Sequence, residues 1–204
     1  MSQSEVDRPH LLIIGGPNGS GKSSAYQASV AEIAGQSFRI INPDLFTIRL
    51  NQSEFAGNNA NLNAVLRIEQ WLETSILAGH TVGVETVLST SKYRRLVTLA
   101  KSLGYRFLLI YVILDDPRHN IERVRIRVKR GGHDVPLDKI LSRYDRSLEQ
   151  LPWFLAQADA AWIWDNSGAT IRSIGEKVDG KIRVDEKAMQ VIVDAAQAAV
   201  KLKG

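Results

Sequence analysis

The sequence contains no cysteine among its 204 residues, which excludes a disulfide framework. It has no long apolar run either, because the stretch LLII at residues 11–14 is far too short to span a bilayer. The first ten residues lack the basic start, the apolar centre and the cleavage site of a secretory signal. We therefore expect a cytoplasmic protein with no membrane association.

Internal repeats, low-complexity tracts and long linkers are also missing. Apolar residues make up 44% of the chain, which is enough to bury a substantial core. We expect a single domain over residues 1–204, with a core at residues 10–167 and a C-terminal appendage at residues 168–204.

Strand-like apolar runs alternate with helix-length segments along the expected core. The expected strands are HLLIIGG (10–16), FRIINPD (38–44), TVGVET (81–86), RFLLIYVILDD (106–116) and AWIWDN (161–166). The expected helices are at residues 22–35, 62–78, 92–102 and 118–130, with one or two more before residue 159. This alternation is typical of βαβ units, and strands that are apolar on both faces suit a sheet covered on both sides. The pattern predicts a three-layer α/β fold with a mainly parallel sheet of about five strands.

The last residues follow a different pattern. A hairpin is expected to turn at Asp179-Gly180, and a helix to follow it. The apolar stripe of that helix would be Met189, Ile192, Val193, Ala196 and Val200.

Residues 16–23, GPNGSGKS, match the phosphate-loop pattern G-x-x-x-x-G-K-[ST] between a predicted strand and a predicted helix. Glycines let successive backbone N–H groups point at phosphates, and the helix N-terminus adds partial positive charge. Lys22 would reach the β and γ phosphates and Ser23 would ligate magnesium. The alternative is a glycine-rich turn without a ligand. The expected ATP-binding residues are Gly16, Pro17, Asn18, Gly19, Ser20, Gly21, Lys22, Ser23, Ser24 and Asn166.

The same loop spelling is found in transporter-type ATPase domains. Those domains also need a signature resembling L-S-G-G-Q and a strand ending in Asp-Glu. The nearest segments, VLSTSKY and ILDDPRH, lack the glycines and the glutamate. We therefore exclude that class.

Two carboxylates lie at the carboxyl ends of predicted strands, the sheet edge where ligands collect in α/β folds. Asp44 is a candidate to take a proton from an acceptor hydroxyl, or alternatively a helix N-cap. Glu85 is a candidate for magnesium and substrate, since an unpaired carboxylate there would be costly to bury. The hydroxyls of Thr86, Ser89 and Thr90 could bind a polar substrate or cap the next helix.

The basic segment after the fourth strand is predicted to be a helix with two distinct faces. Ile121, Val124 and Val128 form a buried stripe, whereas Arg123, Arg127 and Arg130 share another face. Guanidinium groups from a lid could stabilise a transferring phosphoryl group, and the glycine pair 131–132 would let the lid move. The alternative is a solvated charged face.

Nucleic-acid binding by these arginines would need interleaved aromatic residues, which the segment lacks. The next histidine, His133, is either a phosphate or substrate donor or a structural residue.

Five segments, GGPNGSGKSS, INPD, VETVLST, RVRIRVKRGGHDVP and RYDRSLEQL, together resemble the zeta toxin family of P-loop kinases. The resemblance covers residues 10–167 and implies a kinase-type P-loop fold, ATP with magnesium, and phosphorylation of the sugar 3'-hydroxyl of UDP-N-acetylglucosamine. By position, Lys22 and Ser23 match the ATP and magnesium residues of the family. Asp44 matches its catalytic base, Glu85 its substrate-contacting acid, and the arginines of 123–130 its lid.

The sequence has ETV where the best-known toxins have Glu-Gly-Thr, so the departure falls on the acceptor side. The leading hypothesis is an ATP- and magnesium-dependent kinase of a nucleotide-sugar hydroxyl, with an antitoxin as a possible partner. The alternatives are a nucleoside, polynucleotide or NAD kinase, or a regulatory ATP-binding switch.

Overall fold

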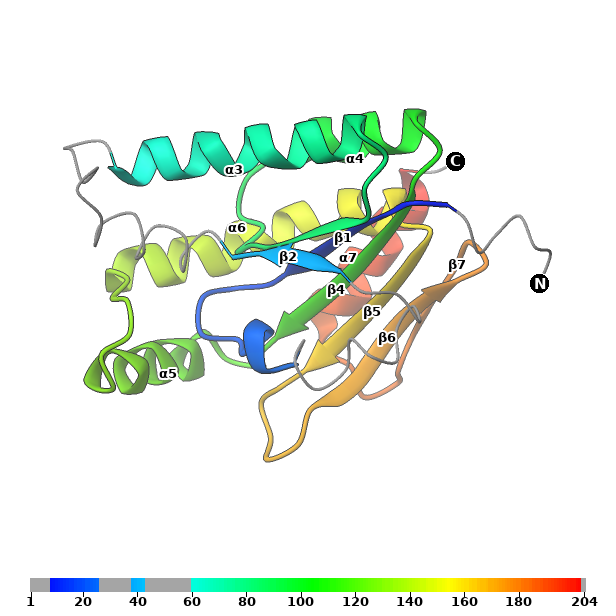
Figure 1. Ribbon diagram of the computed structural model, residues 1–204. Coiled ribbons are helices and arrows are strands. Elements are labelled where there is room, and N and C mark those ends of the chain that lie inside the picture. Colours follow the sequence, from blue (N-terminus) through cyan, green and yellow to red (C-terminus); the bar gives the residue numbers. More distant parts are fainter. Residues whose placement is uncertain (1–7, 26–37, 43–59, 203–204) are drawn as a thin grey trace.

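The computed structural model describes residues 8–25, 38–42 and 60–202 (Figure 1). Its strands are β1 (His10–Gly15), β2 (Arg39–Ile41), β3 (Val82–Glu85), β4 (Arg106–Ile113), β5 (Ala160–Asp165), β6 (Arg172–Val178) and β7 (Lys181–Val184). Its helices are α3 (Ala60–Leu77), α4 (Arg94–Ser102), α5 (Pro117–Lys129), α6 (Leu137–Gln157) and α7 (Gln190–Lys201). Residues 22–25 are also helical.

The described strands form one sheet in the order β2-β3-β1-β4-β5-β6-β7. The pairings from β2 through β5 are parallel, and β6 and β7 add two antiparallel strands at one edge. The predicted α/β fold with about five parallel strands is confirmed. The segment between β4 and β5 contains two helices, α5 and α6.

The core lies mainly between the sheet and one layer of helices. Leu11 and Ile13 of β1 pack there with side chains of α3, α4, α6 and α7. Leu12 and Ile14 point to the other face and pack with Ala25, just after the phosphate-loop motif. All of β1 is buried, which is why its sequence is apolar at consecutive positions.

The predicted hairpin is confirmed, with Asp179 and Gly180 both at positive φ, 49° and 75°, as a two-residue hairpin turn requires. The hairpin is joined to the sheet through β5, and α7 packs against α6. The predicted stripe of α7 is partly wrong. Val200 is 59% exposed, and Ala195 and Ala199 are buried instead, because the helix turns its small side chains toward α6.

The C-terminus of α6 is capped by two lysines from distant elements. Lys177 of β6 is almost fully buried, and its Nζ donates to the carbonyl oxygens of Leu155 (2.6 Å) and Ala156 (2.9 Å). Lys101 of α4 donates to the carbonyl oxygen of Gln157. The last carbonyls of a helix lack partners within the helix and carry partial negative charge, so cations stabilise them.

Among the described helices, none combines the length and the apolar composition that a membrane span requires.

We expect Lys177→Met to lower the free energy of unfolding by about 1–3 kcal/mol, because two carbonyls lose a charged donor in a buried setting. Chemical denaturation would measure the loss. Lys181→Met, at an exposed position of β7, is the matched control and should change little. Equal stability of the two variants would show that the cap contributes nothing.

Candidate active site

The carboxyl ends of the parallel strands bring the predicted site segments together. Ile14 pairs with Glu85, Gly15 with Tyr111, and Ile113 with Asp165. The phosphate-loop motif therefore begins between the end of β3 and the end of β4. Ligands of open α/β sheets bind at this edge.

Two glycines of the phosphate loop approach other parts of the chain too closely for a side chain. Gly16 has φ +141°, and a Cβ there would lie 2.0 Å from the carbonyl oxygen of Val112 in β4. Gly21 has φ +89°, and a Cβ there would lie 2.2 Å from Nδ2 of Asn166. Glycine at both positions is thus required by the close packing of the loop as well as by its backbone conformation.

The two functional side chains that end the motif take different positions. Lys22 is buried, and its Nζ donates to the carbonyl oxygens of Gly16 (2.8 Å) and Pro17 (2.9 Å), so its ammonium group lies over the loop. The Ser23 hydroxyl donates to both carboxylate oxygens of Glu85, at 3.0 and 2.9 Å. The structure therefore brings together the two residues predicted to hold magnesium.

The loop and its contacts suit a phosphate and a hard cation. Asn18 Oδ1 and Ser20 Oγ are buried and have no hydrogen-bond partner among the described residues, which is costly unless a ligand or water supplies one. A hydroxyl and a carboxylate are oxygen ligands, and magnesium is commonly held by one or two protein oxygens together with phosphates and water. The described residues contain no group of three His, Cys, Asp or Glu side chains able to hold a metal.

Asp44, the predicted catalytic base, lies outside the described residues.

The segment of residues 86–90, which carries the three predicted substrate hydroxyls, is described. The alternative that these hydroxyls cap the next helix is wrong. Helix α4 begins at Arg94 with Tyr93 as its N-cap, so the hydroxyls of residues 86–90 do not cap it. Thr86 Oγ1 instead accepts from the backbone N–H of Leu88 (3.2 Å), whereas Ser89 is half-buried and Thr90 is exposed.

Leu88 holds the segment in place and was missed by sequence reasoning. It has φ +59°, which is unusual for a bulky residue, and its side chain is buried against Gly15. The residue before it, Val87, is held by a buried pair of hydroxyl groups from Ser147 and Tyr111. Ser147 Oγ of α6 donates to the carbonyl oxygen of Val87 (2.8 Å) and is hydrogen-bonded to Tyr111 Oη (2.9 Å). No sequence motif marks Ser147, because its partners come from β4 and from a loop 60 residues away.

The arginine face predicted for residues 123–130 exists. Arg123, Arg127 and Arg130 line one groove of about 360 Å³ with Ile126 and Gly132. Arg127 donates to the carbonyl oxygen of His133 (2.8 Å). The His133 side chain is exposed.

The opposite face of α5 carries the predicted apolar stripe. Val124 is buried, and Ile121 and Val128 are partly buried. They pack with Val135 and Ile140.

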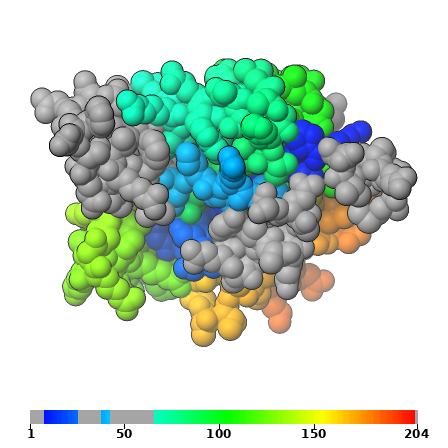
Figure 2. All heavy atoms as spheres, viewed as in Figure 1, coloured from blue at the N-terminus to red at the C-terminus, as the bar shows by residue number. Residues whose placement is uncertain are grey.

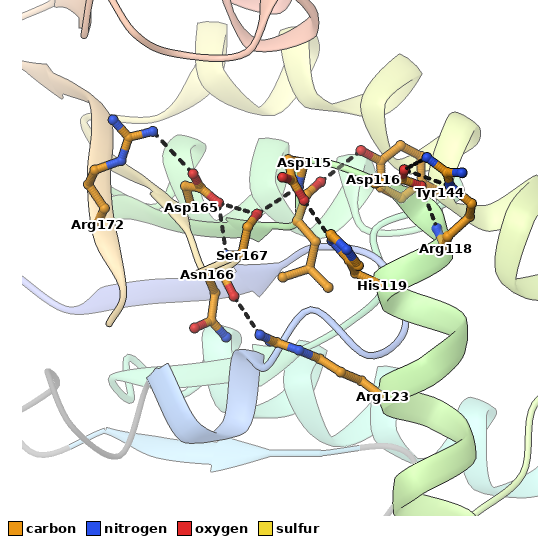
Figure 3. Close-up of polar contacts among 11 residues, drawn as sticks. Asp115, Asp116, Arg118, His119, Arg123, Tyr144, Asp165, Asn166, Ser167 and Arg172 are labelled. Carbon is orange, nitrogen blue, oxygen red and sulfur yellow. Dashed lines mark hydrogen bonds and ion pairs between the residues drawn. The ribbon is translucent and has the colours of Figure 1, made fainter. Parts of the chain in front are cut away.

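A polar network lies beyond the phosphate loop, where β4 and β5 end (Figure 3). Ser167 Oγ donates to Asp165 and accepts from the N–H of Asp115, and Asp115 contacts His119 at 2.9 Å. Burial raises the pKa of Asp165, but hydrogen bonds from Ser167 and Arg172 outweigh it and leave that pKa below its usual value.

The residues around the start of α5 have strongly shifted pKa values. Hydrogen bonds from the Arg118 side chain and backbone lower the pKa of Asp116, the N-cap of α5, to about 2. Burial, followed by the charges of nearby aspartates, raises the pKa of Tyr144 to about 12. Tyr144 donates to the carbonyl oxygen of Leu114 and so remains a neutral donor at physiological pH.

A family model described as AAA domain (AAA_33) matches residues 11–151, more than half of the chain. The chain belongs to this family. The match begins in β1 and ends in α6, so it includes the phosphate loop, Glu85 and the arginine face.

Solved structures show that the fold of this chain also occurs in other proteins. A chain of the AvrRxo1-ORF1:-ORF2 complex with ATP has a TM-score of 0.69 and 16% identity, over 99% of this chain and 68% of that one. The same complex with sulphate ions has a TM-score of 0.68 and 17% identity, over 95% of this chain and 65% of that one.

A structure of the PezAT toxin-antitoxin system of Streptococcus pneumoniae has a TM-score of 0.58 and 18% identity. It is matched over 93% of this chain and 77% of that chain. The fold is thus a P-loop kinase-like α/β fold, while the chain spans about two thirds of the AvrRxo1 chains. No curated protein matches the sequence.

We expect Ser147→Ala to lower the free energy of unfolding by about 1–3 kcal/mol, because the Val87 carbonyl and the Tyr111 hydroxyl lose a buried partner. Urea unfolding would measure the loss. Ser142→Ala, an exposed position of the same helix, is the control. A loss below about 0.5 kcal/mol, typical of surface substitutions, would contradict a structural role for the hydroxyl pair.

The pH dependence at the start of α5 follows from the lowered pKa of Asp116. Its carboxylate contributes stability that is fully present above the ordinary pKa of about 4 and is lost as pH falls through about 2. An NMR titration should find this carboxyl ionised at pH 3, and Arg118→Met should raise its pKa toward the ordinary value. An unchanged pKa in that variant would exclude the Arg118 side chain as the main cause.

Proposed function

We propose that the protein is an ATP- and magnesium-dependent kinase that transfers the γ-phosphoryl group to a sugar hydroxyl, with UDP-N-acetylglucosamine or a related nucleotide-sugar as acceptor. The observation that carries the proposal is the contact between Ser23 and Glu85 beside the buried Lys22. A glycine-rich turn without a ligand would not need a lysine over the loop or a carboxylate against the motif serine. We also propose that residues 1–204 act as one domain, since β6 and β7 share the central sheet.

Each site residue has a proposed role in this reaction. Backbone N–H groups of residues 16–24 and Lys22 would hold the phosphates, and Asn166 would border the nucleotide. Ser23 and Glu85 would hold magnesium, which when bound neutralises charge on the β and γ phosphates. Arg127 and Arg130 would stabilise the charge that develops on the transferring group.

The acceptor side completes the chemistry. The acceptor hydroxyl oxygen would bond to the γ-phosphorus as the bond from phosphorus to the ADP oxygen breaks, and Asp44 would take the hydroxyl proton. Glu85 and the hydroxyl groups of Thr86, Ser89 and Thr90 would orient the sugar, with His133 as a further donor. Leu88 and the Ser147–Tyr111 pair fix the backbone of this segment.

The proposal also includes a cellular location and a protein partner. Because ATP and nucleotide-sugars are cytoplasmic metabolites in cells, we place the reaction in the cytoplasm. We also propose an antitoxin-like protein partner, since PezAT is a toxin-antitoxin system and AvrRxo1-ORF1 is bound to ORF2.

The test is ATP consumption with magnesium, with and without UDP-N-acetylglucosamine, in the wild type and in Lys22→Ala and Asp44→Ala. We expect acceptor-stimulated turnover that each substitution lowers by about 100-fold or more, because a positioned base alone contributes about that factor. Lys181→Met, on the exposed face of β7, is the control and should match the wild type.

The other outcomes separate the alternatives. ATP binding without stimulation would overturn this acceptor and direct the assay to NAD, nucleosides and oligonucleotides. The regulatory switch would be favoured if Asp44→Ala bound ATP as the wild type does and if none of these acceptors stimulated ATP consumption. Failure to bind ATP would overturn the kinase itself.

A further inference from the structure

Helix α5 is bonded to the first half of the phosphate loop. Asn120 of α5 is fully buried, and its Nδ2 donates to the carbonyl oxygen of Asn18 at 2.6 Å. The backbone of Gly19 lies so close to the helix that a Cβ there would be 2.6 Å from the carbonyl oxygen of Asn120. Figure 2 shows α5 directly beside the phosphate loop on the molecular surface.

The same helix reaches the second half of the loop through one intermediary. Arg123 donates to the backbone carbonyl oxygen of Asn166 at 2.7 Å, and Asn166 Nδ2 donates to the carbonyl oxygen of Ser20 at 2.8 Å. Figure 3 shows Arg123 extending from α5 to the segment that follows β5. Both halves of the phosphate loop are thus tied to α5.

The spacing along α5 relates these ties to the arginine groove. Asn120 and Arg123 are three residues apart and share one side of the helix. Arg127 and the C-cap Arg130 follow about 6 and 10 Å further along the axis, at a rise of about 1.5 Å per residue. Because the helix is rigid, fixing its first two turns to the loop also fixes the distance from the loop to these two arginines.

The three arginines of the groove therefore have different bonding. The Arg123 guanidinium is bonded to Asn166, and that of Arg127 to the His133 carbonyl. The Arg130 side chain is exposed, and its guanidinium has no hydrogen bond or ion pair with another described residue. A lid that swings as a whole about its N-terminal end would have to break the bonds of Asn120 and Arg123.

We propose that Asn120 and Arg123 are positioning residues that hold the arginines of α5 at the γ-phosphate end of the phosphate loop, so that the site distinguishes ATP from ADP. The inference rests on the proposed nucleotide binding. The backbone N–H groups of the loop recognise the phosphates that ATP and ADP share. The later arginines of α5 recognise the one that ADP lacks.

A purely structural brace predicts a different result. If Asn120 and Arg123 merely stabilise the loop, their loss lowers the affinities for ATP and ADP by the same factor. If they position α5, their loss lowers the affinity for ATP more, because the loop still binds the shared phosphates while the arginines move away. The ratio of the two affinities therefore separates positioning from support.

The experiment measures dissociation constants of ATP and ADP with magnesium by calorimetry on the full chain. We expect Arg123→Met to reduce the ATP-over-ADP preference by about tenfold, the loss of one charge-assisted contact. Arg123→Lys should recover part of the preference, because a lysine can still donate to the Asn166 carbonyl. Lys139→Met removes an exposed cation of α6, outside the proposed machinery, and should behave as the wild type.

A second variant tests whether an effect of Arg123→Met is caused by misfolding. Asn120→Ala should lower the preference in the same direction, with thermal unfolding recorded for every variant. An unchanged ratio in Arg123→Met, an equal change in Lys139→Met, or a wild type without ATP preference would each overturn the inference. A wild type that binds neither nucleotide would overturn the proposed function first, and the inference with it.

Discussion

The parallel pairing of β1 with both β3 and β4 is the constraint on which the rest of the site depends. Parallel strands end at the same edge, so the segments after β1, β3 and β4 must meet there. The phosphate loop then has Val112 on one side and Glu85 on the other. The contacts of the loop with Val112 and Glu85 follow from this arrangement, because a loop this close to both strands has room for few conformations.

The surroundings of the loop hold it through buried polar bonds. Asn120, Asn166 and Ser147 each donate to a backbone carbonyl near the site, and the first and last of them are fully buried. Such bonds are directional and are costly to leave unmade, so they fix the backbone more firmly than apolar contact does. Leu88 adds a left-handed backbone conformation, which costs about 1–3 kcal/mol and persists only where the surrounding packing imposes it.

Sequence patterns predicted the elements well because each element has a local signal. Consecutive apolar residues identified β1 and β4, and Asp179-Gly180 identified the hairpin turn. The motif GPNGSGKS located the loop, because its glycines are required by the loop itself. The arginine face was predictable from helical spacing. The buried face of α7 was not fully predictable, because Ala195 and Ala199 are buried whereas the more apolar Val200 is exposed.

By itself, the sequence determined the order of strands and helices, the phosphate loop with Lys22, and Glu85 as the last residue of β3, since these depend on neighbouring residues. Tertiary structure alone decided which distant residues support them. Asn120 is separated from Asn18 by 102 residues and Asn166 from Ser20 by 146. Lys177 reaches the end of α6 from the hairpin. No local sequence pattern marks these side chains. Each donates to a backbone carbonyl that becomes its neighbour only when the sheet is assembled.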